Sequence, residues 1–582
     1  MKVLSLRLLL PIAALLVAFG PNPARAQAPL EPAQMSPRTA FYLIWHGVPS
    51  PDVRKANSLL ALWDDPDFAP VSSAMVSNLM GSSAEKTPKE KLIADEIQQY
   101  AALLENSFTI GYVSEPQRRA ASKAGGSLNS KPAWNGMFLV YDRTGKEVLL
   151  SKAVLRLRTE EKEAPRLSQV TIGGAQVLKA EGKSGISYWA EHGKYAVSTG
   201  ERSVMEEILG RLDGKLRGAA SLTQSAAYQE AQANLGSGLI EFFLRIPDLE
   251  NLAADSKAGT FQVRPLLDAA GVAALHSVSG HVSFEGAKTH VQAALLGDAA
   301  TGTPFDVWAT GQSSLASLSF VPVDAVSYTS AQLNFLGIYN TVKRVARAAF
   351  PQAQQGNADL LDTIAQHKLG MPAAEALELL TGEFASMQTS ASMDSTKQVY
   401  FLGIRKRPET LKLMRTVFSD QITSERNEDD ITFLKISLGG KQGSTQWNSF
   451  NLAVAPDMIL GANRVETLRE VLAHRAHASA VEGLATAPQF QAGRAKFPEH
   501  LNGLSYFDFQ KVDWQALKDR WIEEAKKSPV ARTMNSSQNV VPSSAPDWLA
   551  QCNPQVFSRH LHYSVSVSWK DSKGIHWDQW VE

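Results

Sequence analysis

The chain has 582 residues, of which 44% are hydrophobic and 20% are charged, and its 58 basic side chains are balanced by 58 acidic ones. Because the net charge is zero, the composition gives no electrostatic reason to expect nucleic acid or an anionic membrane surface as a partner. A lone cysteine, Cys552, excludes an intrachain disulfide, and the length is sufficient for more than one hydrophobic core.

The first 26 residues have the pattern of a secretory signal peptide. Lys2 and Arg7 form a basic start, an apolar run covers residues 8–19, and the motif Ala-Arg-Ala precedes Gln27. We expect cleavage before Gln27, a linker at residues 27–34 and a soluble product in the periplasm or outside the cell, with an uncleaved N-terminal anchor as the alternative. No other segment reaches the roughly 18 apolar residues of a membrane-spanning helix.

The stretch 40–71 predicts one strand followed by two helices. Asp65 before Pro66 can cap the second helix. Ser50 before Pro51 can cap the first, on which four residues are predicted to form one apolar stripe, namely Val53, Ala56, Leu60 and Trp63.

Three acidic residues in this stretch, Asp64, Asp65 and Asp67, raise the question of a cation site. Their spacing lacks the alternating D-x-D-x-D-G pattern that wraps oxygen ligands around calcium. Helix capping and the positive first turn of a helix account for them, so we interpret them as structural. His46 ends the predicted strand and is interpreted as a satisfied surface histidine, with a catalytic role left open.

Two polar segments, 114–136 and 526–547, are predicted to be disordered loops. They contain few apolar residues and many turn-forming ones.

The most informative feature of the sequence is an internal repeat. The stretch YAVSTGERSVMEEILGRL from Tyr195 matches MILGANRVETLREVLAHR from Met458 as strand, turn and helix, at an offset of 263 residues. Six further matches follow in the same order: Pro37 with Pro322, Phe108 with Phe384, Met137 with Tyr400, Tyr228 with Phe490, Leu239 with Gly503, and Leu275 with Leu561.

This repeat predicts an α+β fold with two tandem copies of a mixed helix and antiparallel-sheet domain. The segments HSVSGHVSF and HYSVSVSW alternate with period two, as strands with one wet face do. Helices interspersed among such strands favour antiparallel sheet over a doubly wound parallel one. We place copy 1 at residues 35–305, the joint at 306–314 and copy 2 at 315–582.

No sequence motif identifies a catalytic, cofactor or metal site. His560 and His562 share one face of a predicted strand, and His474 and His477 share one face of a predicted helix, but neither pair has a third ligand at a zinc-like interval. Residues 83–86 fit S-x-x-K without its companion motifs, and G-x-S-x-G, Walker A and G-x-G-x-x-G patterns are absent. We therefore predict no cofactor and no metal, assign no catalytic residue, and interpret Cys552 as an incidental thiol.

Aromatic side chains are the remaining lead. They could line a carbohydrate or lipid groove, but most match apolar positions of the repeat, which favours core anchors. The tryptophans concerned are Trp45, Trp63, Trp134, Trp189, Trp447, Trp514, Trp569 and Trp577.

Several of these segments carry a resemblance. The motif P-x-x-A before an apolar strand, the junction LLTGEF and the stretch YFLGIRKRPETLKLM resemble a family of bacterial exported proteins catalogued as a domain of unknown function. The resemblance implies export and a duplicated α+β architecture, and it supplies no catalytic residues to transfer.

Together these patterns predict a non-catalytic exported protein that binds an envelope ligand or a protein partner. One alternative is a hydrolase of cell-envelope or external polymers, with a site assembled from the loops of one copy, which motif searches would miss. A weaker alternative is an envelope assembly factor with an exposed hydrophobic groove.

Overall fold

A computed structural model describes residues 28–72, 102–114, 136–151, 165–182, 185–236, 238–248, 257–258, 261–300, 302–309, 315–349, 356–393, 397–437, 449–477, 483–495, 497–498, 500–527 and 551–582. The predicted signal peptide, the S-x-x-K segment at 83–86, Trp134 and Trp447 lie outside the described residues. So do most of the two segments predicted to be disordered, at 115–135 and 528–547.

The chain divides into two compact units. Unit 1 comprises Met1–Ala253, His276–Leu296 and Asp547–Asn553, and unit 2 comprises Ala254–Leu275, Gly297–Pro546 and Pro554–Glu582. Each unit combines helices with antiparallel strands, which confirms the mixed α+β class. Among the described residues, no helix is both long enough and apolar enough to cross a membrane.

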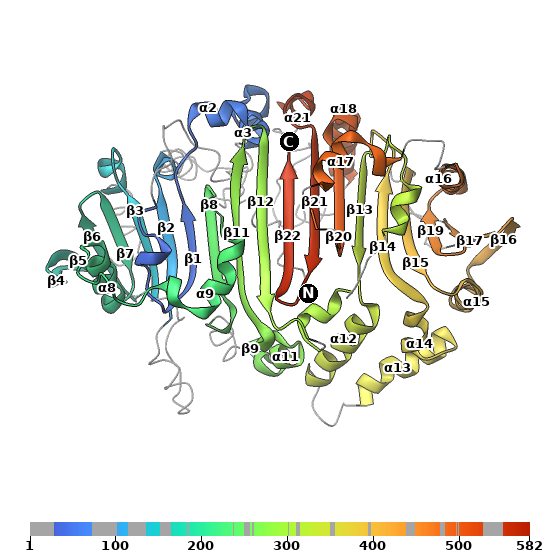
Figure 1. Ribbon diagram of the computed structural model, residues 1–582, viewed down its shortest axis with the longest axis horizontal. Helices are drawn as coiled ribbons and strands as arrows, with labels where there is room; N and C mark the ends of the chain where they lie inside the picture. The colour runs from blue at the N-terminus through green and yellow to red at the C-terminus, as the bar shows by residue number, and fades with distance from the viewer. Residues whose placement is uncertain are drawn as a thin grey trace, which may run out of the picture. The chain divides into compact units, whose positions relative to one another are not determined.

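Unit 1 is built on one antiparallel sheet, in which β1, β2 and β3 lie side by side (Figure 1). Its strands are β1 (Thr39–Trp45), β2 (Phe108–Val113), β3 (Met137–Asp142), β4 (Arg166–Ile172), β5 (Ala175–Gly182), β6 (Gly185–His192), β7 (Tyr195–Thr199), β8 (Ile240–Arg245), β11 (Leu275–Glu285) and β12 (Lys288–Gly297). The pairings give the order β11–β8–β1–β2–β3–β7–β6–β5–β4, and β12 follows β11 through a turn at Gly286.

Helices cover one face of the unit 1 sheet. Helix α8 (Arg202–Leu212) places Val204, Met205, Ile208 and Leu209 on one side, and all four are buried against strand residues such as Val140. This spacing is that of a helix with a single apolar stripe. The same core takes in η1 (Pro32–Gln34), η5 (Leu222–Gln224) and α9 (Ala226–Ala231).

Unit 2 contains a sheet of the same strand order. Its strands are β13 (Ser327–Gln332), β14 (Leu380–Gln388), β15 (Gln398–Ile404), β16 (Ile422–Glu428), β17 (Ile431–Ser437), β18 (Ser449–Val454), β19 (Met458–Ala462), β20 (Gly503–Asp508), β21 (Tyr563–Lys570) and β22 (Gly574–Val581). The pairings give β22–β21–β20–β13–β14–β15–β19–β18–β17–β16.

The main core of unit 2 lies under η9 (Ala316–Phe320), α16 (Val465–Ala476), η12 (Leu484–Thr486) and α17 (Pro488–Arg494). A second cluster packs under α15 (Arg407–Val417). The remaining helices of this unit are α11 (Val263–Ala269), α12 (Phe335–Ala349), α13 (Gly356–Leu369), α14 (Ala373–Glu378), α18 (Trp514–Lys527) and α21 (Gln555–His560).

The two ladders can be compared residue by residue. We align Tyr195 with Met458 and extend this alignment to the other strands through the cross-strand residue pairs of each sheet. The residues that then correspond include Val140 and Phe401, Phe108 and Phe384, Tyr42 and Tyr328, and Phe243 and Tyr506. We call residues at the same ladder position counterparts.

This register changes three of the sequence alignments. It pairs Val323 with Pro37 and Ile240 with Gly503, each one residue from the sequence match, and it pairs Leu139 with Tyr400, two residues away. A shift of one residue in a strand exchanges its two faces, whereas a shift of two leaves the burial pattern unchanged and is harder to detect from sequence.

The first helical stretch also differs from the prediction. Instead of one helix with a single apolar stripe, the structure has two helices, α2 (Pro51–Ala56) and α3 (Ser58–Asp64). Asn57, between them, is the C-terminal cap of α2 and the N-terminal cap of α3. The Asn57 side chain accepts a hydrogen bond from the Leu60 backbone N–H at 3.2 Å, which caps α3. The prediction of one stripe is therefore wrong, and Val53 is exposed while Leu60 is buried.

Candidate functional site

The acidic residues of the first helical stretch have structural partners. Asp64 pairs with the buried guanidinium of Arg54, with Nε and Oδ2 2.8 Å apart. Asp65 Oδ1 accepts from the Asp67 backbone N–H at 2.9 Å, and Asp67 Oδ2 accepts from Asn553 Nδ2 at 2.9 Å. Within the described residues, no group of three or more His, Cys, Asp or Glu side chains is placed to hold a metal ion.

His46 does not lie on the surface, so that interpretation is wrong. It follows directly after β1 and is 6% exposed, and its Nε2 lies 3.5 Å from Glu241 Oε1 on the adjacent strand β8. Its position at the end of a central strand, rather than in an outer loop, explains the burial.

Glu241 lies between two histidines. It is directly opposite His281 of β11, and the Glu241 side chain is only 14% exposed. His281 is buried and accepts a hydrogen bond at Nδ1 from the Gly236 backbone N–H at 2.9 Å. We call His46, Glu241 and His281 the acid–histidine cluster.

The acid–histidine cluster faces the core under α8 and α9. In the core, burial above all, together with the negative charge of Glu241, raises the pKa of Tyr42 and of Tyr228. Ser277 and Ser279, on the same face of β11 as His281, are fully buried, and their hydroxyl oxygens have no hydrogen-bond partner within the described residues. This face is therefore unusually polar for a core.

The counterparts of this cluster in unit 2 are different. Gln332 stands at the position of His46, Leu504 at that of Glu241 and Val567 at that of His281. Leu504 and Val567 are buried in the main core of unit 2. Burying a charged side chain costs free energy that burying an aliphatic side chain does not. Unit 2 avoids this cost at the positions of Glu241 and His281, so the shared strand order does not require the acid–histidine cluster.

The histidine pairs singled out in the sequence do not form sites. His560 ends α21 and His562 precedes β21, so the prediction that both lie on one strand face is wrong. His474 lies on α16 and His477 is its C-terminal cap. Cys552 is buried.

Two of the tryptophans are core anchors. Trp45 is fully buried and donates from Nε1 to the Leu104 carbonyl oxygen at 2.7 Å. Trp514 donates to the Phe509 carbonyl oxygen at 3.0 Å and stacks on Phe557 with ring centroids 4.4 Å apart.

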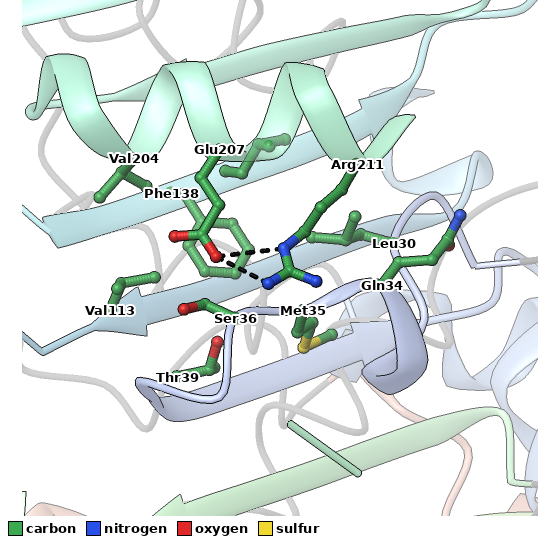
Figure 2. Close-up of a pocket in the computed structure, with 11 residues that line it drawn as sticks. Leu30, Gln34, Met35, Ser36, Thr39, Val113, Phe138, Val204, Glu207 and Arg211 are labelled. Carbon is green, nitrogen blue, oxygen red and sulfur yellow. Dashed lines mark hydrogen bonds and ion pairs between the residues drawn. The ribbon is translucent and has the colours of Figure 1, made fainter. Parts of the chain in front are cut away.

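A small cavity lies between β1 and α8 (Figure 2). Glu207 accepts hydrogen bonds from Arg211 Nε at 3.1 Å and Nη2 at 2.8 Å, and from Arg38 Nη2 at 2.9 Å. Burial alone would raise the pKa of Glu207, but the hydrogen bonds from the two arginines outweigh it and hold that pKa below its ordinary value. The cavity volume is about 10 Å³, which is room for one water molecule beside the hydroxyl of Thr39.

A wider groove borders the same ion pair. Its volume is about 340 Å³, within the size range of small-ligand sites, and it is lined by residues 33–34, 211–214 and 216–219. Two of its charged groups are already paired, Arg211 with Glu207 and Asp213 with Lys215 at 2.7 Å. The groove therefore has the volume of a ligand site but few charges available to select a ligand.

The face of the unit 2 sheet that points away from its main core carries a different kind of surface. Successive paired residues on six strands form one row across it, and each bears a hydroxyl or an amide: Gln579, Ser566, Ser505, Thr329, Ser386 and Tyr400. We call this the hydroxyl row. Thr329 is exposed although β13 lies between two other strands, so the sheet is uncovered at this point.

Among the described residues, the strand neighbours of the hydroxyl row on this face are uncharged. Phe384 of β14 lies beside it on the same face and is 43% exposed. The Thr329 and Ser505 hydroxyl oxygens are 3.0 Å apart. An uncharged surface of hydroxyls and aromatic rings can exchange hydrogen bonds with a ligand without selecting for charge.

Unit 2 also buries a carboxylate, on the opposite face. Glu383 is 2% exposed and accepts from the Ser317 backbone N–H at 2.9 Å and from the Ala316 backbone N–H at 3.1 Å. The Ser317 hydroxyl also donates to Glu383 and lies 2.8 Å from the Tyr328 hydroxyl. Burial raises the pKa of Glu383 despite these hydrogen bonds. Since the donors belong to η9, Glu383 fixes that helix to the sheet.

Sequence reasoning missed Glu241, His281 and the hydroxyl row. These residues are assembled from strands far apart in the chain, so no local motif contains them. The sequence matches pair His281 with Val567 but pair Glu241 with Ser505, so the correspondence of Glu241 with Leu504 emerges only from the register of the sheet.

Comparison of the chain with known protein families, with curated proteins and with solved structures finds no match.

Proposed function

We propose that this chain is an exported, non-catalytic binding protein made of two copies of one α+β unit, and that unit 2 binds an uncharged polysaccharide. Two observations support the duplication. Both units have the same order of strands, and Tyr42 and Tyr328, at the same ladder position, are both fully buried.

The hydroxyl row is the single observation that carries the binding function. Its side chains both donate and accept hydrogen bonds, which matches the hydroxyl groups of a sugar chain. Tyr400 and Phe384 supply aromatic surface on the same face, on which the apolar side of a sugar ring can pack. Because the row has no charged residue, it favours neutral ligands over ionic ones.

The proposed location in the cell envelope follows from the signal-peptide pattern and the proposed ligand. Sequencing the N-terminus of protein recovered from the periplasmic fraction tests it, and Gln27 is the expected first residue. A chain that keeps its first 26 residues and sediments with the membrane would contradict export as a soluble protein.

Affinity electrophoresis tests the binding function. The probes are soluble neutral glucan, mannan and galactan, with the carboxymethylated form of the same glucan as a charged comparison. We expect at least one neutral polymer to retard the protein more than the charged one does. Failure of every neutral polymer to retard it would contradict the proposal.

A matched pair of variants assigns any retardation to the hydroxyl row. Thr329→Lys places a charge in the row, and Thr423→Lys adds the same charge on β16, at another exposed position of unit 2. Only the first variant is expected to lose retardation. Equal loss in both variants would contradict binding at this face.

A hydrolase is the second candidate function. The observation that favours it is the acid–histidine cluster, which unit 2 replaces with Gln332, Leu504 and Val567. A carboxylate beside an imidazole is a common acid–base pair, although the cluster is buried. If the protein cleaves any of these polymers, Glu241→Gln should abolish cleavage while Thr329→Lys leaves the chemistry of the cluster intact.

A further inference from the structure

Within the part of the chain that the structure describes, the last strand of the unit 1 sheet has one edge without a paired strand. Among the described ladders, β4 pairs only with β5, and Figure 1 shows it as the outer strand of that sheet. Arg166, Leu167, Ser168 and Gln169 are all exposed, and Leu167 is 47% exposed. An open strand edge presents backbone N–H and C=O groups to any extended chain that approaches it.

The hairpin geometry shows which groups face outward. β4 and β5 are joined by the Gly173–Gly174 turn, so the flanking residues Ile172 and Ala175 form a hydrogen-bonded pair. Alternation along the ladder then turns the backbone groups of Leu167, Gln169 and Thr171 away from β5. Arg202 Nη2 donates to the Thr171 carbonyl oxygen at 3.3 Å, as expected for an outward-facing carbonyl.

The sequence of β4 is compatible with pairing to itself. If two copies of β4 meet antiparallel around Gln169, then Gln169 faces Gln169 of the other copy, and Leu167 faces Thr171. Ser168 faces Val170, and Arg166 faces Ile172. Among the paired strand residues, no two like charges face each other, and the three outward-facing residues of one copy are opposite those of the other.

The corresponding edge of unit 2 is different. Glu425 of β16 is the counterpart of Gln169, so the same arrangement would bring two carboxylates face to face. Glu425 and Glu428 are also held in ion pairs with Arg415 and Arg469. Charged side chains of this kind keep an edge strand from pairing with another chain.

We infer that β4 is a self-association surface, through which two copies of this chain pair antiparallel around Gln169 and join their unit 1 sheets. The partner is a second copy because the edge is complementary to itself and carries no charge pattern that would select another protein. This inference is independent of the proposed polysaccharide binding.

Disulfide trapping tests the geometry. Around the two-fold axis, the two Gln169 Cα atoms of a hydrogen-bonded antiparallel pair lie about 5.5 Å apart, within the range of a disulfide. Gln169→Cys should therefore give a covalent dimer on mild oxidation, whereas Thr423→Cys, an exposed control position on β16 that leaves Glu425 in place, should not. The native Cys552 is buried and gives little background.

Sedimentation of the purified full chain over a wide concentration range provides the second readout. We expect a monomer–dimer equilibrium that Gln169→Glu weakens by about fivefold, because it places like charges opposite each other. Gln169→Pro should abolish the dimer while keeping the fold, because the lost N–H faces outward. The inference would be overturned by a chain that is monomeric throughout and whose Gln169→Cys variant forms no disulfide-linked dimer, or by one that pairs with a different protein through β4.

Discussion

The second faces of the two sheets show how one strand order carries two chemistries. In unit 2 the hydroxyl row crosses the sheet, whereas its counterparts in unit 1 include Phe242, Leu43, Ile110 and Leu139. In the cores, unit 1 is the more polar of the two, since it buries the acid–histidine cluster where unit 2 buries leucine and valine. Strand order alone therefore does not determine which face is available for function, and the side chains at equivalent positions have to be compared.

The largest expected effect concerns the buried carboxylate of unit 2. Glu383→Ala should lower the free energy of unfolding by about 3 kcal/mol, because two buried donors and one partly buried donor lose their acceptor. Its counterpart Ser107 is an uncharged residue, so Ser107→Ala should cost about 1 kcal/mol. Urea unfolding measures both, and equal losses would contradict the difference between the units.

Helix α8 and its counterpart α16 give a second contrast. Glu207→Ala should cost about 2 kcal/mol, because Arg38 and Arg211 both lose a largely buried partner. Glu470, the counterpart of Glu207, is mostly exposed and pairs only with Lys397 in the described residues, so Glu470→Ala should have little effect. A larger effect at Glu470 than at Glu207 would reverse the contrast.

Giving unit 1 the residues of unit 2 should stabilise it. The triple variant His46→Gln, Glu241→Leu and His281→Val should gain about 1–2 kcal/mol, since buried ionisable groups are replaced by residues that unit 2 accommodates in its own core. Thermal unfolding of the full chain measures the change. A loss of stability would show that the acid–histidine cluster is part of the framework of unit 1.

The smallest expected effect is a difference in pH dependence. Because the pKa of Glu383 is raised, the folded chain binds its proton more tightly than the unfolded chain, and stability falls as the pH rises from the ordinary glutamate value through the raised one. The lowered pKa of Glu207 acts in the opposite direction, and its contribution is lost as the pH falls below the ordinary value through the lowered one.

Two matched variants separate these contributions. Glu383→Gln should flatten the stability profile above the ordinary pKa of glutamate, and Glu207→Gln should flatten it below that value. Urea unfolding across a pH series measures both slopes. An unchanged profile in either variant would contradict the assigned direction.

Period-two alternation and small-residue turns were sufficient to predict the mixed α+β class from sequence, and the alternating segments correspond to β11 and β21. Faces were harder to predict, because a one-residue error between Pro37 and Pro322 exchanges the two sides of β1. The break at Asn57 was missed because its side chain caps a helix inside an otherwise helical pattern. The acid–histidine cluster and the hydroxyl row could not be predicted, since both depend on which strands become neighbours.

One reciprocal exchange tests the central claim most directly. Thr329→Leu gives unit 2 the residue of unit 1 at the centre of the row, and Leu43→Thr makes the opposite change. Affinity electrophoresis against the neutral polysaccharides should show weaker retardation for Thr329→Leu and unchanged retardation for Leu43→Thr. Retardation that survives Thr329→Leu but is lost in Leu43→Thr would place binding in unit 1 and contradict the account.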